Sequence, residues 1–323
     1  MASNMTASIN QTRPTWQQLN EVSLRLLALQ GPAEIAKFVL ALAATICNIL
    51  LFVTIVKTPS LRIKTQLVVA SLAATEAIAE STFVFMGARR SVHYILGWPE
   101  TKYQIPCMLL AYPTTMTRHA EALMMLLVSL DRLLIVSLPN IYRSIPTRIY
   151  IPLLHLLTWT FGILHFPFIF YYIDSTNVPA ICTAYSTLSP HYLRYINIEG
   201  NVITASTCTA YAVIIIILVR RLMVVQPVDP TQPQDNWREV ELETVKAIGV
   251  FVAIYLLNIG GSSLISIIST SGILPLDVFA KYAPFGALLG TLNSLSHLPV
   301  YFKMSKRFRE AFMNIMCGKG STS

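Results

Sequence analysis

Two adjacent charged residues, Asp131 and Arg132, interrupt the apolar run MMLLVSLDRLLIVSLP at 124–139. A carboxylate beside a guanidinium can form an ion pair, and each group can also bind partners on neighbouring helices. Charged side chains are costly where lipid surrounds them and less costly near the membrane boundary, where water and headgroups reach them. The pair is therefore either a contact between helix ends or, for Arg132, a side chain that extends to the interface.

Further ionisable residues lie deeper in the apolar stretches. One stripe of the same predicted helix, at steps of three or four residues, contains Thr114, Arg118, Glu121, Met125, Val128 and Arg132. Such spacing places residues on one helix face. Glu76 and Glu80, four residues apart, share a face of an earlier helix. If Arg118, Glu121 and these two glutamates faced lipid, they would together cost on the order of 10 kcal/mol. They must therefore face neighbouring helices.

The elements that must position these residues are membrane-spanning helices. Of the 323 residues, 54% are hydrophobic and only 12% are charged, whereas soluble domains carry about 25% charged residues. Apolar stretches long enough to cross a hydrocarbon layer of ~30 Å occur at 37–57, 66–88, 104–138, 149–173, 196–222, 245–270 and 280–302. The sequence predicts an all-α membrane protein, a seven-transmembrane helix bundle that crosses the plasma membrane repeatedly.

The distribution of basic residues predicts an extracellular N-terminus. With that orientation, fifteen of the 24 Lys and Arg lie on the cytoplasmic side, as the positive-inside rule requires. Asn4 and Asn10 begin two glycosylation sequons in the polar first segment. The net charge of +8 indicates attraction to the anionic lipid of the inner leaflet. Nucleic acid is not expected as a partner, because the basic residues lie in short loops and a tail.

The expected domains are an extracellular N-terminal tail (1–36), the bundle (37–302), and an amphipathic helix with a cytoplasmic tail (303–323). Cys107 and Cys182 fall on the outer, oxidising side, where a disulfide can persist, and we predict that they are joined. Cys317 follows MSKRFREAFMNIMC, whose apolar residues share one side of a helix while basic residues supply charge. That pattern favours a helix along the inner membrane surface with Cys317 as a palmitoylation site. A soluble tail with an unmodified thiol is the alternative.

The chain resembles rhodopsin-type (class A) G-protein-coupled receptors over nearly all of its length. Asp131-Arg132-Leu133 occupies the place of that family's Asp-Arg-Tyr motif, and Arg132 follows Cys107 by 25 residues. In chain order, the other matching residues are Asn48 in CNILL, Glu76 in SLAATE, Trp159, and Asn293, Ser294 and Tyr301 in LNSLSHLPVYFKMSKRFREAF. The order and spacing of these matches carry the resemblance.

Several positions depart from the family pattern. Leu133 replaces the motif tyrosine, His297 stands in place of an asparagine, and Tyr255 stands where the family has a tryptophan toggle. Leu257 replaces the proline of the sixth span, and the fifth span has no proline, although Tyr211 matches its inner tyrosine. Together with LDRLLIVSLPNIY, these departures are similar to nematode serpentine chemoreceptors.

The resemblance implies a role for the charged pair. Arg132 would hold the inner helix ends together at rest and, on activation, line the crevice that receives the C-terminal helix of a heterotrimeric G protein. Asp131 would be its adjacent partner, and Glu239 or Glu241, at the base of the sixth span, are candidate resting partners. The residues expected in G-protein coupling are Asp131, Arg132, Tyr211 and Tyr301.

By the same resemblance, one set of residues falls where the family builds its central sodium pocket. The expected buried polar core comprises Asn48, Glu76, Glu121, Asn293, Ser294 and His297. Two close carboxylates cannot easily both ionise, so they should share a proton, with His297 as a cationic partner. We hypothesise a proton-occupied or histidine-neutralised core in place of a sodium site. A static polar network that only fixes helix packing is the alternative.

Arg118 lies one turn above this core, at the depth where the family binds ligands. It is predicted to pair with an acidic group on a small ligand, and pairing with Glu121 three residues on is the alternative. The expected ligand-binding residues are Tyr112, Thr114, Arg118, His119 and Tyr255. Thr114 stands where amine receptors carry an aspartate and Thr291 where opsins carry the retinal lysine, so neither a biogenic amine nor retinal is favoured.

The predicted function is a chemoreceptor that binds a small ligand within the bundle and activates a G protein. The alternative is a seven-helix transporter or channel that uses the buried Glu, His and Arg residues as an ion or proton pathway. Seven spans do not divide into the repeated halves of many transporters. No enzyme activity, cofactor or metal is expected, because the sequence has no paired-Cys spacing, no phosphate-binding loop and no His-Glu-x-x-His motif.

Overall fold

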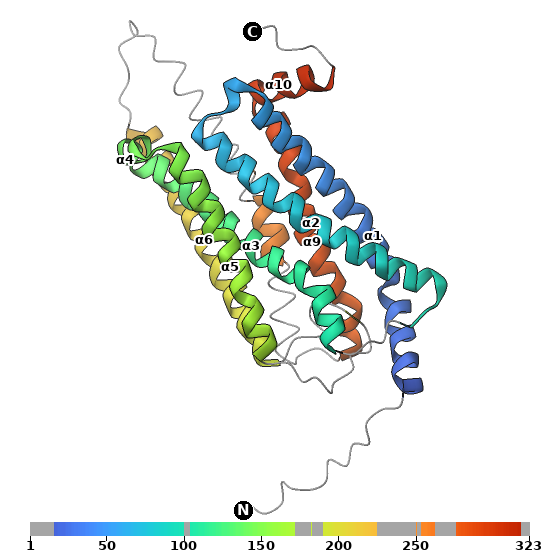
Figure 1. The fold of residues 1–323 in the computed structure, drawn as a ribbon. Coiled ribbons are helices and arrows are strands. Elements are labelled where there is room, and N and C mark those ends of the chain that lie inside the picture. Colours follow the sequence, from blue (N-terminus) through green and yellow to red (C-terminus); the bar gives the residue numbers. More distant parts are fainter. Residues whose placement is uncertain are drawn as a thin grey trace, which may run out of the picture.

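The computed structural model describes residues 16–99, 104–171, 182, 190–224, 250, 253–261 and 276–317, which contain helices and no strand. Six long helices run side by side as a bundle (Figure 1). They are α1 (Trp16–Lys57), α2 (Lys64–Leu96), α3 (Gln104–Ser137), α5 (Thr147–Tyr171), α6 (Pro190–Val224) and α9 (Leu276–Met304). The short elements are the 3₁₀-helix η1 (Pro59–Leu61), α4 (Pro139–Ser144), the π-helical turn η2 (Leu256–Gly260) and α10 (Lys306–Met316).

The predicted spans correspond to these long helices, but α1 is longer than expected. It begins at Trp16 rather than near residue 37. Gln30, Glu34 and Lys37 interrupt its apolar pattern, yet all three are buried. Glu34 and Gln30 both bind Arg90 of α2. These contacts explain why polar side chains of α1 can be buried against a neighbouring helix. The predicted boundaries of the helix bundle, at residues 36 and 302, stay a prediction. Of the sixth predicted span, the structure describes only residues 250 and 253–261.

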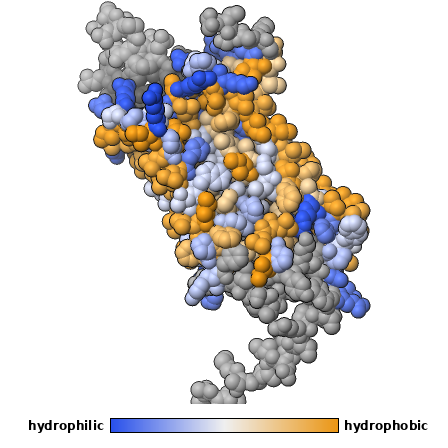
Figure 2. All heavy atoms as spheres, viewed as in Figure 1, coloured by the Kyte–Doolittle hydropathy of each residue, from blue (hydrophilic) through white to orange (hydrophobic). Residues whose placement is uncertain are grey.

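The bundle has the surface of a membrane protein. Four described segments are long and apolar enough to cross a bilayer: Asn20–Lys57, Lys64–Leu96, Thr147–Ile169 and Arg194–Arg220. Large apolar side chains such as Ile46, Leu156 and Ile216 are at least half exposed on them. Figure 2 shows apolar residues over much of the visible flank, with hydrophilic ones near the end that carries α10 and another hydrophilic group toward the opposite end. Because so large an apolar surface is unfavourable in water, it indicates contact with lipid.

The charged stripe predicted on the third span belongs to α3, which packs against α2, α5 and α6. Met124, Met125 and Val128 form an apolar cluster with residues of α2 and α5. At Gly162 of α5 the contact is close enough that an added Cβ would lie 2.7 Å from the carbonyl oxygen of Met116. Small residues permit such close approach between membrane helices. The central place of α3 turns its polar residues toward protein.

At one end of the bundle, α10 lies across the ends of α1 and α9 (Figure 1). Its first turn is capped by Ser305, whose hydroxyl oxygen accepts a hydrogen bond from the Phe308 backbone N–H at 3.2 Å. Phe308 is buried against Leu51 and Ile55 of α1. The predicted amphipathic C-terminal helix is therefore confirmed. Cys317 is exposed just beyond it, and its palmitoylation stays a prediction.

At the opposite end, a disulfide joins Cys107 of α3 to Cys182, as predicted. Both cysteines are fully buried. We call this the disulfide end of the bundle and the other the α10 end. Asn4 and Asn10, the predicted glycosylation sites, lie outside the described residues, as do Glu239 and Glu241. Glycosylation and an extracellular N-terminus stay predictions.

Candidate functional site

Arg118 of α3 lies between two carboxylates. Its Nη1 atom is 2.7 Å from Oε2 of Glu121, one turn further along α3, and its Nη2 atom is 3.5 Å from Oε1 of Glu80 on α2. The guanidinium also lies over the ring of Phe83, 4.1 Å from the ring centroid, a favourable cation–π contact. The ion pair between Arg118 and Glu121, which sequence spacing suggested as an alternative, is thus present. The additional contacts with Glu80 and Phe83 were not predicted.

The polar contacts continue toward α1 and α9. Nδ1 of His297 lies 3.5 Å from Oε2 of Glu76, and the Ser294 hydroxyl lies 3.4 Å from the same carboxylate oxygen. Asn48 of α1 donates from Nδ2 to Oγ of Ser294 at 2.8 Å. Thr291 donates to Glu80 at 3.3 Å. Asn293 is also buried. The structure therefore brings the residues predicted for the polar core into one region.

The charge balance of this region constrains its chemistry. We name as the core cluster five residues, Glu76, Glu80, Arg118, Glu121 and His297. With all three carboxylates ionised and neutral histidine, its formal charge is −2, and protonation of His297 raises that charge to −1. Uncompensated charge is costly in a buried site, and the three carboxylate residues are at most 5% exposed. The nearby Lys37 ammonium interacts with Glu80 and offsets part of this charge, and a bound proton or a cation would balance the remainder.

A second charged centre lies toward the α10 end of α3. Asp131, 1% exposed, accepts a hydrogen bond from the Tyr150 hydroxyl at 3.0 Å, and its other oxygen lies 4.0 Å from Nε of Arg132. Arg132 donates to the Thr65 carbonyl oxygen at 3.2 Å. Two other predicted residues interact electrostatically with the guanidinium, Tyr211 and Tyr301. All four residues expected in G-protein coupling therefore lie together.

The short helix α4 is held beside this centre. Lys64 of α2 donates to the carbonyl oxygens of Tyr142 and Ile145, both at 2.5 Å, and its ammonium lies 4.3 Å from the centroid of the Tyr142 ring. Burial, and then the nearby Asp131 carboxylate, raise the pKa of the Tyr142 hydroxyl above its usual range. Tyr142 therefore stays a neutral phenol at physiological pH, and the segment linking α3 to α5 is anchored to α2.

The residues predicted to bind ligand do not form a single cluster. Thr114 is buried, and its hydroxyl oxygen has no hydrogen-bond partner among the described residues. Tyr112 packs edge-on against Phe166 of α5, at 4.6 Å between ring centroids. Tyr255 belongs to the apolar cluster around Met124 and Met125. His119, although adjacent to Arg118 in sequence, contacts Glu199 of α6. Of the five predicted ligand-binding residues, only Arg118 belongs to the core cluster.

Sequence reasoning missed two groups of polar residues. The first is the pairing of Glu34 with Arg90 between α1 and α2. The second is the contact of Glu199 with His119 and His165. Ionisable residues next to apolar stretches are a signal that Glu34 and Glu199 share with Arg118 and Glu121.

A family model for the serpentine-type seven-transmembrane G-protein-coupled chemoreceptor Srsx matches residues 41–316. The chain belongs to this family. The match begins within α1 and ends at the last residue of α10, so it includes both charged centres. No curated protein matches the chain. The receptor is a multi-pass protein of the plasma membrane, and its family consists of receptors rather than enzymes.

Proposed function

We propose that this chemoreceptor binds a small extracellular ligand within its bundle and thereby activates a heterotrimeric G protein. One observation carries the proposal: α3 bears two ion-pair centres that both face neighbouring helices. Arg118 pairs with Glu121 and Glu80, and Arg132 lies beside Asp131. Fourteen residues separate the two arginines, which is about 21 Å along a helix. A single rigid element therefore connects a centre in the middle of the bundle with one at the α10 end.

Arg118 is the proposed partner for an acidic group on the ligand. Its side chain is 26% exposed, whereas those of Glu80 and Glu121 are 0% and 6% exposed. A guanidinium binds carboxylates and phosphates through parallel N–H donors. An acidic ligand would compete with Glu80 for the Arg118 guanidinium. Because the contact between Arg118 and Glu80 joins α3 to α2, such an exchange would alter how α3 packs against α2.

Substituting Arg118 tests the ligand assignment. We expect Arg118→Gln to abolish responses to acidic metabolites while surface expression is retained, because the variant keeps much of the side-chain volume and loses the charge. Arg118→Lys should retain a weakened response to acidic metabolites, since a lysine ammonium keeps the positive charge but lacks the parallel N–H donors of a planar guanidinium. Arg25→Gln, on an exposed position of α1, is the matched control and should respond normally. Unchanged potency in Arg118→Gln would refute the assignment.

Substituting Arg132 tests coupling separately. Arg132→Ala should abolish ligand-driven nucleotide exchange on the G protein and leave ligand binding unchanged, because Arg132 lies at the α10 end. Both activities are measured on the same membranes with a panel of acidic and neutral metabolites. Ligand accumulation in sealed vesicles without nucleotide exchange would contradict the receptor function and indicate transport instead.

A further inference from the structure

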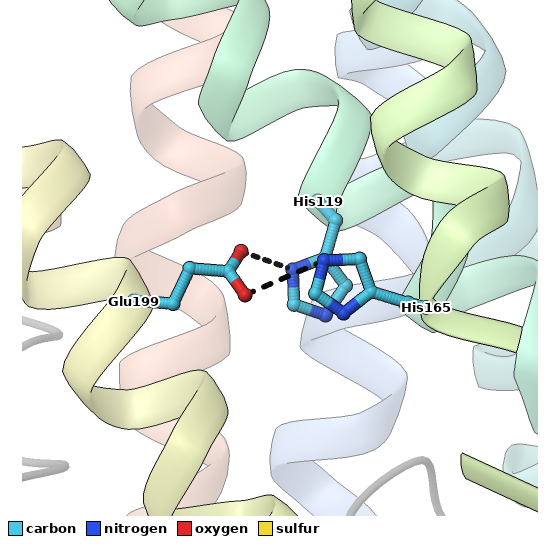
Figure 3. Close-up of side chains that lie close together, drawn as sticks. All are labelled: His119, His165 and Glu199. Carbon is cyan, nitrogen blue, oxygen red and sulfur yellow. Dashed lines mark hydrogen bonds and ion pairs between the residues drawn. The ribbon is translucent and has the colours of Figure 1, made fainter. Parts of the chain in front are cut away.

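Three potential metal ligands converge between α3, α5 and α6. His119 Nδ1 lies 2.8 Å from Glu199 Oε1, and His165 Nε2 lies 3.3 Å from Glu199 Oε2. The two imidazole rings stack, with centroids 3.6 Å apart and planes 6° apart. Figure 3 shows both rings presenting a nitrogen to the same carboxylate. One donor atom from each residue lies within 4.8 Å of the others.

The surroundings orient these donors. Nδ1 of His165 is hydrogen-bonded to the Tyr192 hydroxyl at 2.9 Å, which leaves Nε2 as the atom that faces Glu199. Metal-binding histidines commonly use their second nitrogen in this way. Phe161 packs edge-on against His165, at 5.1 Å between ring centroids. The His119 and Glu199 side chains are each 11% exposed, so the cluster is enclosed but not sealed.

Either protons or a metal could occupy this arrangement. With the Tyr192 hydroxyl donating to Nδ1 of His165, both imidazoles are neutral and each donates an N–H to the Glu199 carboxylate. A divalent metal would replace these two protons and accept lone pairs from the neutral imidazoles and the ionised carboxylate. Metal bonds of about 2.0–2.2 Å place tetrahedral donors about 3.3–3.6 Å apart, so the two stacked imidazole rings would have to tilt out of their parallel arrangement for both nitrogens to point at one ion.

We propose that His119, His165 and Glu199 bind a first-row transition-metal dication of the zinc type, with solvent completing the coordination. Two imidazoles and one carboxylate suit zinc, copper and nickel, whereas magnesium and calcium prefer sets of oxygen ligands. The sequence showed no metal motif because each ligand comes from a different helix. Helix packing alone creates the site, so no short spacing in the sequence reports it.

The metal would link three helices within the half of the bundle nearer the disulfide end. His165 is six residues from Tyr171, the last residue of α5, which is about 9 Å along the helix. A ligand that binds one arrangement better than others shifts the population toward it. Zinc should therefore stabilise the packing of α3 against α5 and α6, and the receptor should unfold at a higher temperature when it is bound.

Direct binding measurements on the purified full-length receptor test this inference. Zinc affinity is measured by competition with a fluorescent chelator, and the unfolding temperature is measured with zinc, magnesium or calcium. We expect zinc alone to raise the unfolding temperature. His165→Ala and Glu199→Gln should each weaken zinc binding at least tenfold and remove that rise, and Tyr192→Phe should weaken binding about tenfold through loss of the hydrogen bond to His165.

His155→Ala is the matched control, because His155 lies on the same helix ten residues before His165 and is only partly buried. It should bind zinc as the native receptor does. His119→Asn, a smaller change that keeps hydrogen-bonding capacity toward Glu199, provides a further variant if His165→Ala does not fold. Zinc binding by His119→Asn and Glu199→Gln with the affinity of the native receptor would overturn the proposal. So would the absence of zinc binding to the folded native receptor, which would leave a polar contact between helices.

Discussion

The ion pair between Glu34 and Arg90 shows how a single buried contact can join two helices. Arg90 Nη1 binds Glu34 Oε1, and Arg90 Nη2 donates to Gln30 at 2.8 Å. Lys37 lies 2.6 Å from the other Glu34 oxygen. All four residues are buried. Removing one partner of a buried ion pair leaves an uncompensated charge and costs about 3–5 kcal/mol.

We therefore predict that Glu34→Gln lowers the free energy of unfolding by about 3–5 kcal/mol, measured by thermal unfolding in detergent, because it leaves the buried charges of Arg90 and Lys37 without their shared carboxylate. The triple variant Glu34→Leu, Lys37→Leu and Arg90→Leu should recover most of this loss, since apolar residues of similar size often replace buried ionic groups without penalty. If the triple variant were as unstable as Glu34→Gln, the interpretation as uncompensated charge would be wrong.

For individual residues, the sequence predicted some contact partners and missed others. The pairing of Arg118 with Glu121 followed from their three-residue spacing, because that spacing is local to one helix. The contact of Arg118 with Glu80 depends on how α2 and α3 are rotated about their axes. The contact of His119 with Glu199 depends on α6 in the same way. Periodicity identifies the face of a helix but does not identify which neighbour that face meets.

Among the elements, α3 and α5 depend on a glycine for their close approach. An added Cβ at Gly162 would lie 2.7 Å from a backbone oxygen of α3, which has little room to shift. We predict that Gly162→Ala destabilises the receptor by about 1–3 kcal/mol, as overpacking typically does. The measurement is the half-life of ligand binding at elevated temperature.

Gly200 of α6 is the matched control, because an added Cβ there meets no atom within 4 Å. Gly200→Ala should be neutral or slightly stabilising, since alanine favours a helix more than glycine does. Equal loss of stability in both variants would show that helix propensity, rather than the contact with α3, explains the effect.

The elements themselves were largely predictable, because apolar length alone marks a membrane-spanning helix. The early start of α1 was not predictable from hydropathy. A hydropathy score treats Glu34 and Lys37 as unfavourable for a membrane span, whether or not a neighbouring helix supplies partners for their charges. α10 was predictable because its apolar and basic residues separate onto two sides within eleven residues. The same reasoning could not show that Phe308 packs on α1, because that contact joins residues more than 250 positions apart.

For the whole molecule, the charge of the core cluster leads to a prediction about ions. If the hypothesised proton-occupied core is present, the potency of a ligand should change with pH and be indifferent to sodium, because a shared proton would balance Glu76, Glu80 and Glu121 in place of a metal ion. Concentration–response curves at several pH values, in sodium and in choline chloride, provide the measurement. Glu76→Gln should reduce the pH dependence. Strong sodium dependence together with indifference to pH would contradict the prediction.

The crosslink between Cys107 and Cys182 has a practical consequence for anyone handling the receptor. Because both residues are fully buried, a thiol reagent in the bathing buffer has no direct path to either sulfur. The native receptor should therefore survive purification in mild reductant, and reduction should begin only once that region loosens. Resistance of Cys107 and Cys182 themselves to alkylation after such treatment, with the exposed Cys317 as the site that does react, then serves as a quality check for correctly assembled material before any functional assay.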